Sequence, residues 1–185
     1  MRGNKSRVGM IMFILSEGVF FLLLILAYVT YHRDQGNGPT AANTLDTLRT
    51  GVFTLFLLAS SMTMAMAAGA YRRNRRGRLA AWLVATIVLG GVFLVGQGME
   101  YAALIREDVT ISRNLFGTTF FTLTGFHGLH VLIGLVMLAT ILALSRLGNS
   151  REPRGGAMEA VSVYWHFVDG VWVVIFSVVY LWALL

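Results

Sequence analysis

Long apolar runs separated by short polar segments dominate this chain. Five of these runs are long enough to cross a bilayer, which takes about 20 helical residues. They cover residues 8–31, 48–70, 79–103, 115–145 and 158–184. Because a backbone exposed to lipid must satisfy its own hydrogen bonds, each run is predicted to be an α-helix. The fourth run is longer than a bilayer needs, so its helix should extend beyond the hydrocarbon region.

The short segments between the runs predict that consecutive helices are antiparallel neighbours in one bundle. The pattern therefore indicates an all-α polytopic membrane protein, with residues 1–185 forming a single membrane domain. The first run follows basic residues, as the core of a signal peptide does. It is too long for one and contains Glu17, so we expect a retained helix. Asn43 or Asp46 is expected to cap the second helix.

Small residues spaced four apart predict close contacts between helices. Ala65 and Gly69 form such a pair in the second run, and Thr86 and Gly90 form one in the third. The same second run contains three methionines at alternate positions, which cannot all share one helical face. We interpret Met62, Met64 and Met66 as packing residues and not as a copper site.

Composition supports the membrane class and narrows the chemistry. Apolar residues make up 56% of the chain and charged residues only 13%, too few to cover a soluble domain of this length. The chain has no cysteine, which excludes disulfides, thiolate metal ligands and a cysteine nucleophile. The net charge of +6 is distributed over short loops, which indicates membrane orientation and not nucleic-acid binding.

The distribution of lysine and arginine predicts the topology, because cytoplasmic loops are enriched in both. The N-terminal tail carries three, the second loop five and the fourth loop three, whereas the first and third loops carry two each. We therefore expect the N-terminus in the cytoplasm and the C-terminus outside. The arginines of the second loop are interpreted as a topology anchor on anionic lipid, with partner docking as the alternative. They are Arg72, Arg73, Arg75, Arg76 and Arg78.

Polar side chains inside the apolar runs are the candidate functional residues, since ionisable groups at membrane depth are costly. They are Glu17, Gln97, Glu100, His127, His130, His166 and Asp169. Glu17 must be protonated, paired inside the bundle or part of a proton path. Gln97 and Glu100 lie three residues apart near the outer end of the third helix. With Tyr101 they predict a local hydrogen-bond cluster.

The histidines admit several interpretations. His127 and His130 share one helical face, and so do His166 and Asp169. Spacing favours packing and interhelical hydrogen bonds, but it leaves open a haem held by two histidines or a histidine–carboxylate metal site. The His166–Asp169 pair is also compatible with a hydrogen bond within one helix, in which the carboxylate fixes the imidazole tautomer.

Four motifs in order resemble those of subunit III of the haem–copper respiratory oxidases. The first helix contains FILSEGVFFLLLILAYVTYH, similar to the family's Ser-Glu followed by aromatics. The third ends in GQGMEYAAL, which resembles Gln-x-x-Glu-Tyr. The fourth contains ISRNLFGTTFFTLTGFHGLHVLIG and the fifth YWHFVDGVWVVIFSVVYLW, which resemble the family's Phe-His-Gly-Leu-His and Trp-His-Phe-Val-Asp patterns.

The resemblance implies a subunit without its own redox chemistry. Subunit III of this family binds no haem or copper, which lie in subunits I and II. It packs beside catalytic subunit I, holds structural phospholipid, and supports turnover and proton uptake. Glu17 matches the family's carbodiimide-reactive membrane glutamate, a reaction that requires a protonated carboxyl group. His127 and His130 match the family's histidines, and we interpret them as polar ties between helices.

The likeness covers the whole chain but corresponds to the short, five-helix bacterial form and not to the seven-helix form. Gly170 stands where the family pattern has a bulkier residue, which predicts a closer helix contact. We therefore predict an accessory subunit III, without a catalytic centre, metal or cofactor, in the cytoplasmic membrane of a bacterium. Its expected partners are subunit I, the other oxidase subunits and membrane lipids, with a respiratory supercomplex as a further assembly.

Several alternatives to this function remain open at this stage. The complex could use cytochrome c, which we favour, or quinol as its electron donor. A related alternative is the subunit-III-like partner of nitric oxide reductases. More distant ones are a small proton-coupled transporter using Glu17, Glu100 and Asp169, and a free-standing b-type cytochrome. Five helices without an inverted repeat or a broken helix pair count against the transporter.

Overall fold

The computed structural model describes residues 2–31, 45–112, 115–146 and 155–182. Within these ranges every long element is a helix. The elements are α1 (Arg2–Tyr31), α3 (Thr47–Arg72), α4 (Arg76–Arg106), α5 (Leu115–Arg146), α6 (Gly155–Phe176) and the π-helical turn η1 (Ser177–Leu181). All five predicted helices are confirmed, and each is long and apolar enough to cross a membrane. They begin or end a few residues beyond the apolar runs, because backbone hydrogen bonding continues into the polar ends.

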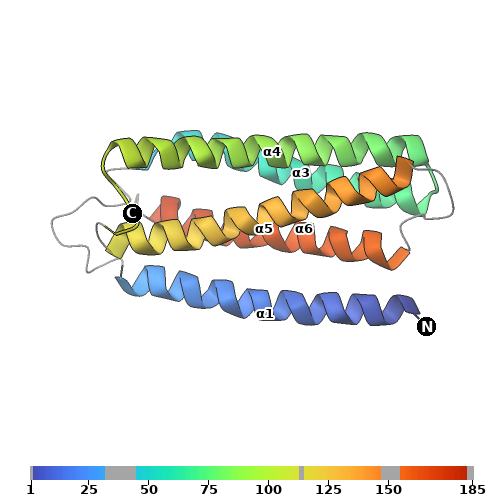
Figure 1. Cartoon of the computed structure of the whole chain (residues 1–185), viewed down its shortest axis with the longest axis horizontal. Helices are drawn as coiled ribbons and strands as arrows, with labels where there is room; N and C mark the ends of the chain where they lie inside the picture. Colours follow the sequence, from blue (N-terminus) through green and yellow to red (C-terminus); the bar gives the residue numbers. More distant parts are fainter. Residues whose placement is uncertain (1, 32–44, 113–114, 147–154, 183–185) are drawn as a thin grey trace.

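Successive helices alternate in direction, as the short connections predicted (Figure 1). Helices α3 and α4 lie against each other along their length, whereas α1 packs against α5 and α6. Helix α6 is central to this arrangement because it also packs against α3 and α5. The start of α1, the α3–α4 turn and the start of α6 lie at one end of the bundle (Figure 1). This agrees with the grouping of the basic segments, although the side of the membrane stays a prediction.

Two polar residues with positive φ end the helices of the α3–α4 hairpin. Asn74 (φ 52°) follows α3 and Asp108 (φ 62°) follows α4, and both residue types tolerate the left-handed conformation better than most. At the start of α3, the carboxylate of Asp46 accepts a hydrogen bond from the backbone N–H of Arg49 at 2.9 Å. Asp46 is therefore the N-cap of α3. It was one of the two predicted candidates, and the other, Asn43, lies outside the described residues.

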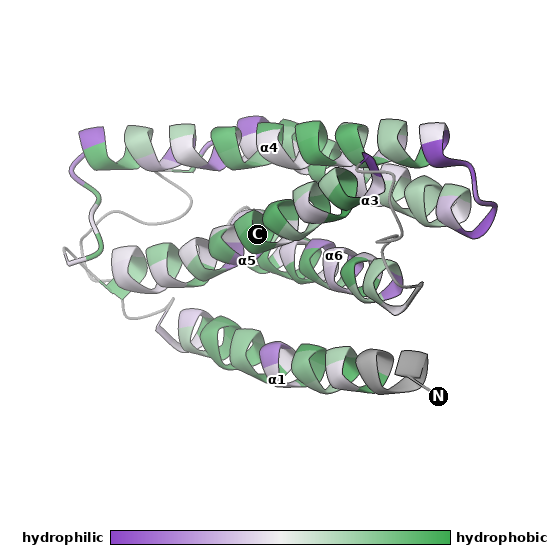
Figure 2. Cartoon of the chain, turned by 45° about the vertical axis from the view of Figure 1, so that its right-hand side comes forward, coloured by the Kyte–Doolittle hydropathy of each residue, from purple (hydrophilic) through white to green (hydrophobic). Residues whose placement is uncertain are grey.

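The core is formed largely by aromatic side chains on the inner face of α6. Trp165 and Trp172 are both fully enclosed, and each donates its indole N–H to a hydroxyl group of α3. Trp165 bonds Ser60 at 3.0 Å and Trp172 bonds Thr54 at 2.9 Å. Hydrophilic residues are concentrated at the ends of the helices and in the α3–α4 turn, and the stretches between them are mostly apolar (Figure 2).

Glycines of α4 and α5 make room for the Trp165 ring. A Cβ atom added at Gly90 would lie 2.8 Å from the indole, and one added at Gly134 would lie 2.9 Å from it. Both distances are too short for real carbon contacts, so only glycine fits at these positions. Thr86 also shares a 2.8 Å hydrogen bond with Thr63 of α3. The predicted close contact at Thr86 and Gly90 is therefore confirmed.

The other predicted close contacts are not made between helices of this chain. Ala65 is exposed, and a Cβ at Gly69 would meet no atom within 4 Å. The pair lies off the buried face of α3, which carries Thr54, Ser60, Met64 and Ala67. Gly170 is likewise exposed, with no atom within 4 Å of an added Cβ. Within the described part of the chain, Gly170 therefore makes no closer helix contact.

Candidate functional site

Glu17 and His130 form a polar contact between α1 and α5 in the apolar interior. Nε2 of His130 lies 3.1 Å from Oε2 of Glu17, with the two side chains 10% and 22% exposed. Glu17 is therefore paired inside the bundle, which was one of the three states that its position predicted. This contact connects α1 to α5.

The other ring nitrogen of His130 restricts where the protons can be. Nδ1 lies 2.7 Å from the carbonyl oxygen of Phe126, and because a carbonyl can only accept, Nδ1 carries a hydrogen. Two states of the pair satisfy this arrangement. Either Nε2 also carries a hydrogen and Glu17 is ionised, or Nε2 accepts a hydrogen bond from a protonated Glu17. In both states one proton lies between the two side chains.

Aromatic residues fix this pair in place. The ring of Phe21 meets the His130 ring edge to face, with centroids 4.9 Å apart. The hydroxyl of Tyr164 on α6 donates to the carbonyl oxygen of His130 at 3.0 Å. His130 thereby connects α1, α5 and α6 through hydrogen bonds.

His127 behaves differently from His130, although the two are one helical turn apart. Its ring is fully buried and stacks on Trp172 with centroids 4.8 Å apart. Phe93 and Phe21 approach from other sides. Neither ring nitrogen has a hydrogen-bond partner among the described residues. The interpretation of His127 as a polar tie was therefore wrong, because it packs as an aromatic ring in an aromatic cage.

Gln97 and Tyr101 of α4 bind the turn of α5 around Thr124. The Gln97 amide donates to the carbonyl oxygen of Thr124 at 2.7 Å. The Thr124 hydroxyl donates to Phe120, so it accepts from the Tyr101 hydroxyl at 2.7 Å. Gly128 faces Gln97 so closely that an added Cβ would lie 2.7 Å from the amide oxygen. These contacts join α4 to α5.

Glu100 is buried near the same end of the bundle and has two hydroxyl donors. Its Oε1 accepts from Thr50 of α3 at 2.9 Å, and its Oε2 accepts from Tyr180 of η1 at 2.7 Å. The predicted cluster of Gln97, Glu100 and Tyr101 thus exists as two adjoining networks, one to α5 and the other to α3 and η1. Together the two networks connect α3, α4, α5 and η1 near one end of the bundle.

His166 and Asp169 meet α3 and not each other. Nδ1 of His166 lies 2.7 Å from the Ser61 hydroxyl. Asp169 is buried, and the same hydroxyl lies beside it, but no described group reaches either carboxyl oxygen with hydrogen-bond geometry. A hydrogen bond within the His166–Asp169 pair is therefore absent from the described structure. The two side chains and Ser61 form a small polar cluster where α6 packs against α3.

The remaining candidates lie where their chemistry predicts. The five arginines Arg72, Arg73, Arg75, Arg76 and Arg78 surround the α3–α4 turn at one end of the bundle and are exposed. Met64 is buried while Met62 and Met66 are exposed, so the three methionines do not converge. Within the described ranges, no group of three or more histidine, aspartate or glutamate side chains is placed to hold a metal ion.

The geometry also bears on the distant alternatives. The rings proposed as haem ligands are engaged separately: His130 with Glu17, His166 with Ser61, and His127 with Trp172. The carboxyl groups proposed as a relay are equally separate, because Glu17 bonds α5, Glu100 bonds α3 and η1, and Asp169 lies beside Ser61. The described structure thus favours hydrogen-bonded architecture over either alternative.

Sequence reasoning missed the hydroxyl residues of α3 that bind these candidates. Thr50 bonds Glu100, Thr54 bonds Trp172, and Ser61 bonds His166. Their spacing of four and seven residues places them on one helical face. That periodicity was the available signal, but single threonines and serines in an apolar helix can also bond their own backbone.

Comparisons with known proteins agree with this architecture. The family model described as cytochrome c oxidase subunit III matches residues 2–184. The chain is 36% identical to the probable cytochrome c oxidase subunit 3 of Mycobacterium leprae, over 97% of this chain and 89% of that protein. It is 38% identical to cytochrome c oxidase subunit 3 of Synechocystis, over 94% and 74%.

A third relative is cytochrome c oxidase subunit 3 of Corynebacterium diphtheriae, 39% identical over 97% of this chain and 89% of that protein. The family match runs through all five helices and includes every polar residue of the networks described above. Five apolar helices, their buried polar ties and these relatives lead to one conclusion: the chain belongs to the cytochrome c oxidase subunit III family and is an accessory, multi-pass membrane subunit of a haem–copper oxidase.

Proposed function

We propose that this chain packs beside catalytic subunit I of a bacterial haem–copper oxidase, stabilises it and supports its proton uptake, without holding haem or copper itself. The observation that carries the proposal is that the intramembrane polar side chains contact other helices of this same chain. The histidines and carboxyl groups bond or pack between helices of this chain, as His130 does with Glu17, and this arrangement suits a structural subunit.

The proposal extends to location and electron donor. The family match and the five helices support a place in the bacterial cytoplasmic membrane, with the arginine-rich end in the cytoplasm. The relatives' names support cytochrome c, and not quinol, as the donor to the whole complex. Membership of a respiratory supercomplex is a further proposal of the same kind.

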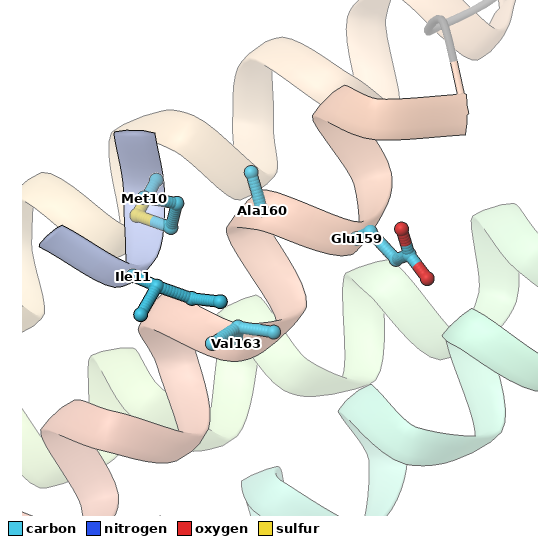
Figure 3. Close-up of a pocket in the computed structure, with 5 residues that line it drawn as sticks. All are labelled: Met10, Ile11, Glu159, Ala160 and Val163. Atoms are coloured by element: carbon cyan, nitrogen blue, oxygen red, sulfur yellow. The ribbon is translucent and has the colours of Figure 1, made fainter. Parts of the chain in front are cut away.

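Bound phospholipid is supported by two hollows beside the start of α6. The smaller, of about 140 Å³, lies between α1 and α6. Figure 3 shows Met10 and Ile11 of α1 beside Ala160 and Val163 of α6, with the carboxylate of Glu159 pointing away from them.

The larger hollow, of about 440 Å³, lies between α3 and α6 and is lined by Tyr71, Arg72 and Ser162. We propose that acyl chains occupy the apolar parts of these hollows and that Arg72 binds an anionic headgroup. Arg72→Gln should then reduce the phospholipid that co-purifies with the chain, measured by native mass spectrometry. Arg106→Gln, at the opposite end of the bundle, is the matched control. Equal lipid in both variants would contradict the headgroup site.

Purification in mild detergent through a tag on this chain tests the main proposal. Large haem- and copper-containing subunits should co-purify, identified by mass spectrometry, and a reduced-minus-oxidised spectrum should show their haem. After the partners are stripped away, this chain should be colourless. A haem band that stays with the isolated chain, or a chain recovered without oxidase subunits, would contradict the proposal.

A further inference from the structure

His166 occupies an unusual position on the outer face of α6. The helix directs Glu159, Val163, His166, Gly170, Val174 and Ser177 outward, in a stripe at helical spacing, and His166 is exposed there. At 1.5 Å per residue it lies about 15 Å from the start of the apolar segment at Gly156, which is about half of the 30 Å hydrocarbon thickness. The side chain is therefore near the middle of the bilayer.

Exposed side chains in the middle of α4 and α5 are apolar. The outer faces of α4 and α5 carry Val88, Val95, Leu132 and Val136. The polar candidates of the other helices are enclosed: Glu100, His127 and His130 are buried, and Glu17 contacts His130. Hydrocarbon offers no hydrogen bonds, so an imidazole facing lipid carries a free-energy cost.

Only one of the two ring nitrogens of His166 has a hydrogen-bond partner in the described structure. Nδ1 bonds the Ser61 hydroxyl at 2.7 Å, whereas no described residue forms a hydrogen bond with Nε2. The ring is thus held in one orientation by α3 while a hydrogen-bonding atom stays available on the surface. A group outside this chain can satisfy it.

Gly170 lies one turn further along the same face and forms a notch. A Cβ atom added there would meet nothing within 4 Å, whereas Gly90 and Gly134 are filled by the chain's own Trp165. Exposed valines, Val163 and Val174, flank the notch. A small residue with apolar neighbours and an interhelical hydrogen bond is the combination with which transmembrane helices associate closely.

We propose that the outer face of α6, centred on His166 and Gly170, is a docking surface for a transmembrane helix of another oxidase subunit. That helix approaches closely at Gly170 and offers a polar side chain to Nε2 of His166. A hydroxyl group fits, because it can donate or accept and so matches either imidazole tautomer. The inference rests on the proposed membership of an oxidase complex and names the surface used for it.

Site-directed cross-linking tests the surface, because the chain has no cysteine of its own. A benzophenone maleimide attached to Gly170→Cys in native membranes should cross-link this chain to a membrane segment of another oxidase subunit. Val88→Cys on α4 and Val136→Cys on α5 are comparably exposed controls, 57% and 59%, and should yield mainly lipid adducts. Cross-linked peptides are identified by mass spectrometry.

Lipid adducts alone at position 170, in membranes from which the intact complex still co-purifies, would overturn the docking surface and leave the proposed function standing. A chain that co-purifies with no oxidase subunit would overturn both. Protein cross-links from Val88→Cys or Val136→Cys, with none from Gly170→Cys, would show that the partner contacts α4 or α5, and would overturn the proposed surface on α6.

A matched pair of substitutions provides an independent readout. Gly170→Leu fills the notch and should lower the recovery of the chain in the complex by about tenfold, the effect of 1.4 kcal/mol in association. Gly98→Leu on α4 is the control, because Gly98 is also exposed with no atom within 4 Å of an added Cβ. Helicity and detergent stability of the isolated chain should be alike for both variants. Equal recovery in the complex would contradict the proposal.

Discussion

Glu17 and His130 lie 113 positions apart in the chain, and their side chains meet at 3.1 Å. The contact joins the first helix to a pair of helices from the second half of the sequence. Because Nδ1 of His130 donates to the Phe126 carbonyl oxygen, the contact with Glu17 involves Nε2 and a single proton. A carboxyl group in the apolar part of α1 thereby obtains a partner without water.

Glu17→Gln should preserve most of this contact, because the amide can donate to the free lone pair of a neutral His130. Glu17→Ala leaves Nε2 unpaired and should lower the free energy of unfolding by about 1–2 kcal/mol. The measurement is unfolding of the purified chain by titration with a denaturing detergent. If glutamine were as destabilising as alanine, the pair would need the glutamate charge, and the ionised state would be the correct one.

Gly90→Ala should destabilise the chain because the new methyl group would lie 2.8 Å from the Trp165 ring. Overpacking of this kind costs about 1–3 kcal/mol. Gly91→Ala is the adjacent control, since a Cβ there meets nothing within 4 Å. The two midpoints of thermal unfolding should separate clearly, with Gly91→Ala close to the parent. Coinciding midpoints would mean that the Trp165 ring can move aside without cost.

His127→Leu should be tolerated, since no described group forms a hydrogen bond with the His127 ring. Replacing a buried polar group that lacks a partner by an apolar one of similar size is close to neutral or stabilising. His130→Leu removes the bonds to Glu17 and Phe126 and should cost about 1–3 kcal/mol. Detergent unfolding curves of the two variants compare them directly. Similar losses would show that His127 has a polar role after all.

The arginine-rich turn should set the orientation of the α3–α4 hairpin. Changing Arg72, Arg73, Arg75 and Arg76 together to glutamine should give a mixed orientation, because it reduces the positive charge that we predict retains this turn in the cytoplasm. Gly77→Cys reports the side of the membrane through a membrane-impermeant maleimide applied to intact cells. The same four changes to lysine keep the charge and should leave Gly77→Cys unlabelled. Labelling in the lysine variant would contradict the charge rule here.

The sequence was sufficient to predict the five helices and their alternation, because hydrophobic length is a strong local signal. It also predicted which polar residues lie within those apolar helices. It could not predict their partners, since helical periodicity says which residues share a face and not which face meets which helix. Glu17 and His130 were each recognised, yet nothing in their spacing indicates that they meet.

Two predicted contacts are not made within this chain, for the same physical reason. Ala65 with Gly69 and Gly170 have the small side chains typical of helix interfaces, but no helix of this chain packs against them. The buried face of α3 includes hydroxyl groups such as Thr54, which accepts the indole N–H of Trp172. The choice between two suitable faces depends on the partner helix, which a single helix sequence does not contain.

The central position of α6 has a consequence for the order in which the protein is made. A ribosome delivers α1 to the membrane before α6. Helix α1 has its partners in α5 and α6, so Glu17 enters the bilayer long before His130 exists. Trp165 and Trp172, which bind α3, are inserted after all four of the helices that surround them. The bundle therefore cannot close until α6 is inserted, and until then the hydroxyl groups of Ser60 and Thr54 lack their indole partners.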